Sequence, residues 1–180
     1  MAEREILIWP DPLLKQRSEL VTDFGPEIER LAEDMLETMY ANDGIGLAAP
    51  QVGVFKRLLV LDLHAGHDQR PPDEPPIIVI NPEFVSKSGT IIWEEGCLSV
   101  PGETGDVTRA SEVTVRYQNV HGEEFEIEAE GLLAVALQHE NDHLDGVLFV
   151  DHLSKLKRDV IKRKMIKLKA ERSEDKLQAS

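Results

Sequence analysis

Hydrophobic residues recur at helical spacing in three parts of the chain. After Pro26, apolar side chains return every three or four positions, which predicts a helix with one core-facing side that ends near residues 42–44. A second helix is expected over residues 130–145; its first half is apolar on every side, which indicates burial in the middle of the domain. A third helix is expected over about 153–172, where apolar residues alternate with lysines.

Short apolar runs and alternating patterns predict strands between these helices. Residues 58–63 and 77–80 are expected to form two short strands, separated by a polar, proline-rich surface loop over 64–76. Apolar and polar residues alternate over 112–120 and again over 125–129, which predicts a β-hairpin. This order predicts an α+β fold, in which mixed or antiparallel sheets pack around the central helix, with a helix near each terminus.

Length and composition are those of one globular domain. The 180 residues, 41% of them hydrophobic, are expected to form a single domain over 1–180 that buries about two thirds of its unfolded surface. No apolar run approaches the ~20 residues that cross a bilayer, and the first residues lack the pattern of a signal peptide. We therefore expect a soluble, cytoplasmic protein without a membrane partner.

Charge is distributed unevenly along the chain. The net charge of −14 divides into 10 basic and 29 acidic residues over 1–150, a net of −19, and 10 basic and 5 acidic residues over 151–180, a net of +5. The acidic body disfavours binding to DNA or to nucleic acid in general. The basic C-terminal helix could dock on a polyanion such as ribosomal RNA, or it could be a solvated helix that offsets the charge of the body.

A segment of small residues, 44–53, follows the first helix. It contains three glycines in the order GIGLAAPQVG and is expected to be irregular, with a backbone that a ligand approaches closely. Its glycine spacing matches neither of the common phosphate-binding patterns. The segment therefore indicates a ligand site of another kind.

The central helix carries an H-E-x-x-H motif. His139 and His143 stand one turn apart on one helix face, so both imidazoles can bind one metal ion, and Glu140 lies beside them. A divalent ion lowers the pKa of a bound water towards ~7, and the glutamate then serves as general base. The motif thus predicts metal-dependent hydrolysis.

The third metal ligand distinguishes between classes of enzyme. The metzincin pattern fails because Phe149 stands where its last histidine belongs, and Glu171 and Glu174 lie in a lysine-rich tail that is a poor source of a zincin-type ligand. The chain has one cysteine, Cys97, which excludes an internal disulfide and leaves a buried hydrophobe, a nucleophile or a metal ligand. Two preceding carboxylates disfavour a free thiolate, so a ligand is the better interpretation. The predicted ligands are Cys97, His139 and His143, with a fourth position open.

Three segments resemble, in order, the signature motifs of bacterial peptide deformylases. They are GIGLAAPQ at 44–51, EGCLS at 95–99 and QHENDHLDG at 138–146. The resemblance implies an enzyme that removes the N-formyl group from the formylmethionine of nascent polypeptides and releases formate. It implies that Cys97, His139 and His143 hold the metal and that Glu140 shuttles the proton.

The resemblance also implies roles in binding. The Gln51 side-chain amide and the Leu98 backbone N–H would donate hydrogen bonds to the developing oxyanion of the formyl group. The substrate would lie against residues of the glycine-rich segment and the central helix and near one arginine. These substrate-binding residues are Ile45, Gly46, Leu132, Val135 and Arg109.

The metal and the rival functions stay open at this stage. The donor set suits Zn²⁺, whereas the resemblance implies Fe²⁺ in the cell, which Zn²⁺, Ni²⁺ or Co²⁺ can replace. The expected partners are N-formylmethionyl nascent chains and, through the C-terminal helix, the ribosome. The rivals are another H-E-x-x-H metallopeptidase or amidase and a structural zinc protein, which would need a fourth protein ligand.

Overall fold

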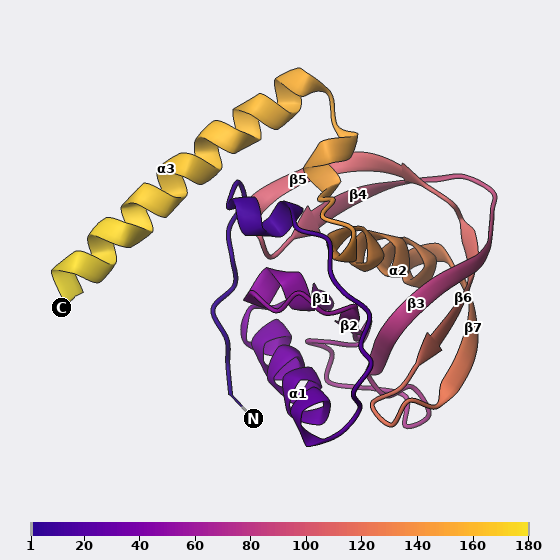
Figure 1. Cartoon of the computed structure of the whole chain (residues 1–180). Helices are drawn as coiled ribbons and strands as arrows, with labels where there is room; N and C mark the ends of the chain where they lie inside the picture. Colours follow the sequence, from indigo (N-terminus) through magenta and orange to yellow (C-terminus); the bar gives the residue numbers. More distant parts are fainter. Residues whose placement is uncertain (1, 180) are drawn as a thin grey trace.

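The computed structural model describes residues 2–179, and Figure 1 shows how their elements are arranged. The helices are α1 (Pro26–Ala41), α2 (Gly131–Leu144) and α3 (Lys155–Ala179), with short 3₁₀ turns η1 (Pro12–Lys15), η2 (Ala49–Val52) and η3 (Phe149–His152). The strands are β1 (Gly46–Ala48), β2 (Leu58–Leu61), β3 (Ile77–Ser88), β4 (Ile91–Cys97), β5 (Val100–Arg109), β6 (Glu112–Gln118) and β7 (Glu124–Glu130).

Two antiparallel sheets enclose α2. One sheet has the strand order β1-β2-β3-β6-β7, and the other is the β4-β5 hairpin (Figure 1). The inner faces of β2, β6 and α2 share one hydrophobic cluster, in which Leu137 and Leu144 of the helix pack with Leu61 and Val115 of the sheet. Burial of these side chains holds α2 in the centre of the molecule. The predicted α+β class with a central helix is confirmed.

Helix α1 forms where the sequence predicts it. Pro26 occupies the first helical turn, and one stripe faces the core through Ile28, Met35 and Met39, which are 0–1% exposed. The helix ends at Ala41, and the left-handed residue that follows is Asp43, with φ 57°. The chain therefore turns sharply just before the glycine-rich segment.

Several elements differ from the sequence predictions. The glycine-rich segment is not irregular, because Gly46–Ala48 pairs with β2 and Ala49–Val52 forms a 3₁₀ turn. Strand β3 continues past Ile80 to Ser88 through shifts of register that Asn81, with φ 53°, helps to accommodate. The β4-β5 hairpin lacks the simple alternation that predicts strands, since glycines and a proline interrupt it, and it was not predicted.

Helix α3 is longer than predicted and packs sparsely. It runs to Ala179, and only Ile161 and Met165 are buried, whereas Leu156 is 74% exposed. Figure 1 shows its C-terminal half projecting from the body. Among the described residues, no helix combines the length and the hydrophobicity that a bilayer-spanning segment requires.

Candidate metal and catalytic centre

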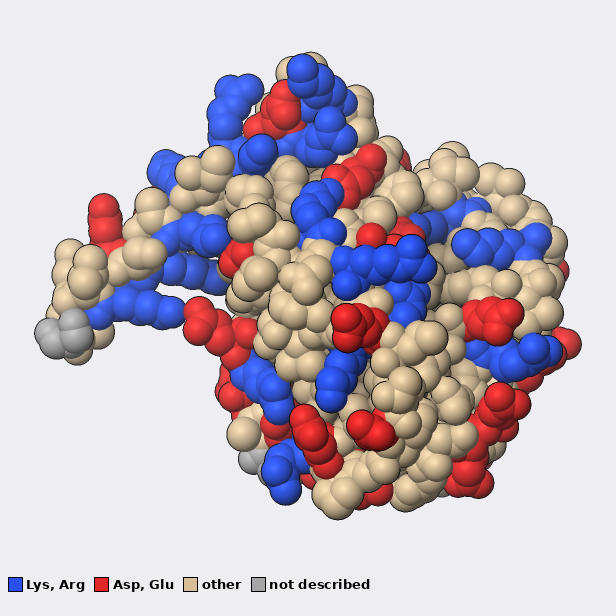
Figure 2. Space-filling model, viewed as in Figure 1, with Lys and Arg blue, Asp and Glu red and all other residues tan. Residues whose placement is uncertain are grey.

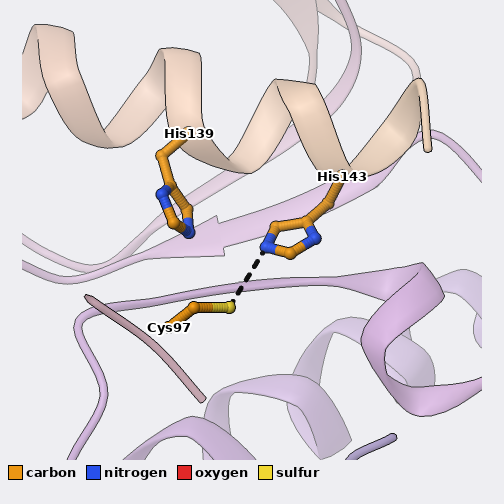
Figure 3. A group of neighbouring side chains, drawn as sticks. All are labelled: Cys97, His139 and His143. Carbon is orange, nitrogen blue, oxygen red and sulfur yellow. Dashed lines mark hydrogen bonds between the residues drawn. The ribbon is translucent and has the colours of Figure 1, made fainter. Parts of the chain in front are cut away.

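Three side chains from two elements meet at one point beside α2. His139 and His143 project from the same face of α2, and Cys97 comes from the end of β4 (Figure 3). Their ligand atoms all lie within 4.8 Å of one another, with Cys97 Sγ 3.4 Å from His143 Nε2. The three predicted metal ligands are therefore brought together.

The arrangement fits a divalent cation. A thiol and two imidazoles form a donor set that Zn²⁺ and similar ions bind. His139, Glu140 and His143 are buried and Cys97 is half-buried, and burial would disfavour so many polar groups without a partner. One oxygen of Glu140, Oε2, is buried beside it and has no hydrogen-bond partner among residues 2–179. The residues present thus fit a bound metal ion.

Glu95 orients the first histidine. Its Oε1 lies 2.7 Å from His139 Nδ1, and Arg109 donates two hydrogen bonds of 2.8 Å to the same carboxylate. Burial would raise the pKa of Glu95, but the bonds from Arg109 and His139 lower it to about 2. A carboxylate only accepts hydrogen bonds, so Nδ1 carries the proton and Nε2 is left to bind the metal.

The pKa values of the two histidines show where the site favours positive charge. Burial lowers the pKa of His143. Burial also disfavours the charged form of His139, but the neighbouring Cys97 and Glu95 raise its pKa well above the ordinary value. The anionic neighbours of His139 thus favour positive charge at this point, and a divalent cation held by the three ligands would supply it.

Glu140 lies next to the ligands in a tight environment. It is 5% exposed, and its Oε1 is 3.9 Å from His139 Nε2. Burial raises its pKa to about 7, and the charge of His139 offsets part of this effect. Gly46 packs against it so closely that an added Cβ would lie 2.6 Å from Oε1. The glycine at position 46 is therefore needed to leave room for the carboxylate.

Gln51 is fixed with its amide nitrogen towards the site. The Ala48 N–H donates to Oε1 at 2.9 Å, which defines the amide orientation, and Nε2 donates to Ser99 Oγ at 3.0 Å. Nε2 also lies 3.4 Å from Cys97 Sγ. A buried donor is thus held beside the predicted metal position.

A cavity of about 620 Å³ opens at these groups. Its walls include most of the residues predicted to bind substrate or stabilise the oxyanion. These are Ile45, Gly46, Gln51, Leu98, Leu132 and Val135.

Arg109 requires a correction, because the structure does not bring it to the cavity wall. The side chain is buried behind His139, and besides Glu95 it binds Asp142 at 2.6 Å. His152 contacts the same Asp142 oxygen at 2.9 Å. The guanidinium is therefore fully engaged within the protein, where it supports the His139–Glu95 pair instead of contacting substrate.

Glu95 and Ser99 belong to the site but were not among the residues predicted from the sequence. Glu95 was interpreted only as a charge near the thiol, yet it turns towards His139 and Arg109. Ser99 holds Gln51 through its hydroxyl, and its N–H lies 3.4 Å from Cys97 Sγ. Both lie within two residues of Cys97 in the EGCLS segment. This proximity in the sequence was the one feature that could have indicated a role for them at the metal site.

Comparisons with known proteins agree on one family. The family profile described as polypeptide deformylase matches residues 3–159. The chain is 51% identical over 168 residues to a peptide deformylase of Acidobacterium capsulatum, which covers 93% of this chain and 96% of that protein. It is 47% identical to one of Agrobacterium fabrum, over 93% and 96% of the two chains.

Solved structures give the same result. A crystal structure of a peptide deformylase from Legionella pneumophila superposes with a TM-score of 0.87 at 46% identity, over 96% of this chain and 98% of that one. A peptide deformylase of Ehrlichia chaffeensis in complex with actinonin also gives 0.87, at 42% identity, over 93% and 98%.

Proposed function

The chain belongs to the polypeptide deformylase family, a family of metal-dependent enzymes that remove the N-formyl group from nascent polypeptides, and we propose how its residues carry out this reaction. The observation that carries the proposal is the meeting of Cys97, His139 and His143 at one point, with Glu140 beside them. No fourth histidine, cysteine or carboxylate joins this group among the described residues, which favours an open catalytic site over a closed structural one.

Cys97, His139 and His143 would hold one divalent ion. When bound, the ion supplies Lewis acidity, which polarises the formyl carbonyl and lowers the pKa of water. We propose Fe²⁺ as the cellular ion, with Zn²⁺, Ni²⁺ or Co²⁺ as replacements. Arg109 and Glu95 position His139, because their bonds fix the imidazole tautomer.

Glu140 moves the proton. Its Oε2 has no partner among residues 2–179, so it is free to accept a proton from the attacking water. Its pKa, raised by burial to about 7, lets it accept that proton and then release it near neutral pH. The acceptor of the second transfer is the methionine nitrogen, which leaves as an amine while formate departs.

Gln51 and Leu98 stabilise the oxygen of the formyl group. Gln51 Nε2 is preoriented by the bond from Ala48 to Oε1, and Leu98, whose backbone N–H we propose as the second donor, lines the same cavity. Donors that meet a charge developing only in the transition state contribute about 3 kcal/mol each. The rigid placement of Gln51 is what makes this contribution available without reorganisation.

The enzyme binds its substrate mainly through the methionine side chain and the peptide backbone. Leu132 and Val135 line the cavity from α2 and form an apolar wall for the methionine. Gly46 begins β1, an end strand of its sheet that is paired on one side with β2, so the free backbone groups of this edge can pair with an extended substrate. Ile45 directly precedes the strand and lines the cavity, while its carbonyl accepts from the Asp62 N–H at 2.8 Å.

The test is formate release from formyl-Met-Ala-Ser by anaerobically prepared, Fe²⁺-loaded protein. We expect turnover with the formyl peptide and a rate at least about a hundredfold lower with acetyl-Met-Ala-Ser, because the additional methyl group has to fit beside the buried Glu140 and the metal ligands. Absence of formate release would refute the proposal. Comparable cleavage of the acetylated or of an internal amide bond would favour a general metallopeptidase instead.

We further propose that α3 docks on ribosomal RNA. Figure 2 shows lysines and arginines gathered along this helix, in contrast to the mixed charges of the body. Most of them are exposed, and only Ile161 and Met165 of α3 are buried in the body. A basic helix with a largely free surface is suited to phosphate contacts.

We also propose that the described residues act as one domain in the bacterial cytoplasm, where ribosomes and formylated chains occur.

The docking proposal predicts a salt-dependent loss of ribosome binding. Replacing the exposed Lys157, Lys162 and Arg163 by glutamine should lower the slope of log affinity against log salt by about 2, because each phosphate contact contributes roughly 0.7–0.9. The matched control replaces exposed cations of the body by glutamine, with the same change in charge. These control positions are Arg17, Arg30 and Lys87.

The docking proposal predicts that the end of α3 is not needed for catalysis on short peptides. Deletion of residues 170–180 should leave kcat/KM for short peptides unchanged, since none of the described residues 170–179 lines the cavity. Sedimentation with 70S ribosomes at 50 and 300 mM KCl measures binding. Salt-insensitive binding, or equal loss in the body control, would contradict docking through α3.

A further inference from the structure

Besides the predicted metal ligands His139 and Cys97, the ionisable residues that line the substrate cavity are all acidic. No lysine or arginine is part of the wall among the described residues. The acidic residues are Asp43, Glu94, Glu95, Glu103 and Glu140.

Three of these carboxylates have an assigned role or a partner. Glu95 is bound by Arg109, and Glu140 is the buried group at the metal site, with an oxygen that has no partner among residues 2–179. Glu103 pairs with Lys164 at 3.3 Å. Asp43 and Glu94 are exposed, and neither forms an ion pair within the described part of the chain. The uncompensated charge of the wall therefore lies at these two residues.

The hairpin register adds a third negative charge. Glu94 of β4 stands directly opposite Asp106 of β5, and directly opposed side chains lie on the same face. Asp106 is exposed and also forms no ion pair within residues 2–179. Like charges directly opposite each other on neighbouring strands repel and destabilise the pair. A cationic group placed beside the pair would remove that repulsion.

We propose that an acidic rim, composed of Asp43, Glu94 and Asp106, makes the enzyme select formylmethionyl peptides whose following residues are basic over those whose following residues are acidic. This inference rests on the proposed deformylase function and names the substrate class that the site prefers. Asp43 immediately precedes the Gly44–Gly46 wall, and Glu94 lies three residues before Cys97 on the hairpin. In this proposal, the residues of the substrate that follow the formylmethionine leave the cavity between these two walls, both of which line it.

The preference is electrostatic, so it depends on salt. The screening length is about 10 Å at 0.1 M ionic strength and about 3 Å at 1 M. At 20 mM salt, kcat/KM is expected to be about tenfold higher for a peptide with two lysines than for one with two glutamates, and this ratio should fall to about twofold at 1 M.

The experiment compares three amidated peptides, formyl-Met-Ala-Lys-Lys, formyl-Met-Ala-Gln-Gln and formyl-Met-Ala-Glu-Glu. Formate release is measured with the metal-loaded full chain at 20 mM and 1 M salt. The expected order of kcat/KM at low salt is Lys, then Gln, then Glu. Taking the ratio at each salt concentration cancels any effect of salt on the metal site.

A variant with Asp43→Asn, Glu94→Gln and Asp106→Asn should reduce the lysine-to-glutamate ratio to within about twofold of unity. Asparagine suits the left-handed conformation of position 43, so the fold of the turn is retained. The matched control neutralises three exposed acids that do not line the cavity, and it should retain the wild-type ratio. The control changes are Glu33→Gln, Glu124→Gln and Glu128→Gln.

The possible outcomes are distinguishable. Turnover of the glutamine peptide with equal rates for the lysine and glutamate peptides would overturn the rim and leave the deformylase function intact. An equal change of ratio in the rim variant and the control would also overturn it, since net charge alone would then be the cause. No formate from any of the three peptides would overturn the function and the rim together.

Discussion

Replacing Glu140 by glutamine is expected to lower kcat for deformylation by at least about a thousandfold, which is within the range of general acid–base catalysis. Glutamine has nearly the same volume, so it fits against Gly46, where an oxygen of Glu140 now lies. It cannot accept the proton of water or return it to the leaving amine. The loss should therefore appear in kcat, with metal content unchanged.

Kinetics and metal analysis of the same preparation provide the measurement. Glu128→Gln on the exposed face of β7 is the matched control and should keep the wild-type kcat. A reduction of less than about tenfold in the Glu140→Gln variant would contradict a proton-transfer role for this residue.

Replacing Cys97 by serine is expected to weaken binding of Zn²⁺ by at least about a hundredfold and to abolish turnover. Changes that only remove the partner of a metal ligand typically cost 10–100-fold, and here a ligand itself is lost. Serine retains a similar shape, but its neutral hydroxyl is a poor replacement for a thiolate at a zinc site.

A competition titration with a chromophoric chelator gives the affinities. Ser99→Ala is the control, because it removes the hydroxyl that holds Gln51 but leaves the Ser99 backbone N–H near Cys97 Sγ. This control should therefore retain the metal. Equal affinity in the Cys97→Ser variant and the wild type would exclude the cysteine as a ligand.

The metal centre was predictable because its sequence signals are local or unique. His139 and His143 are four residues apart on a helix whose apolar first half already indicated burial. Cys97 is the only thiol, so the choice of a third ligand had few alternatives. Helix α1 was predictable for a similar reason, since its apolar stripe and its proline start are contained within one segment.

The support of the centre depends on contacts that no local pattern contains. The pairing of Arg109 with Glu95 joins residues 14 apart, and its pairing with Asp142 joins residues 33 apart. The first pair joins the two strands of the β4-β5 hairpin, whose glycines conceal its alternation, and the second joins β5 to α2. An arginine in such a hairpin is as compatible with a solvent-facing side chain as with a buried one, and only the assembled fold distinguishes them.

The most direct test of the account is X-ray absorption spectroscopy of the Zn²⁺-loaded protein. The account predicts one sulfur at about 2.3 Å and two imidazole nitrogens at about 2.0–2.1 Å, with an additional light atom in the fourth position. A spectrum without a sulfur neighbour, or one with four protein ligands and no open position, would contradict it.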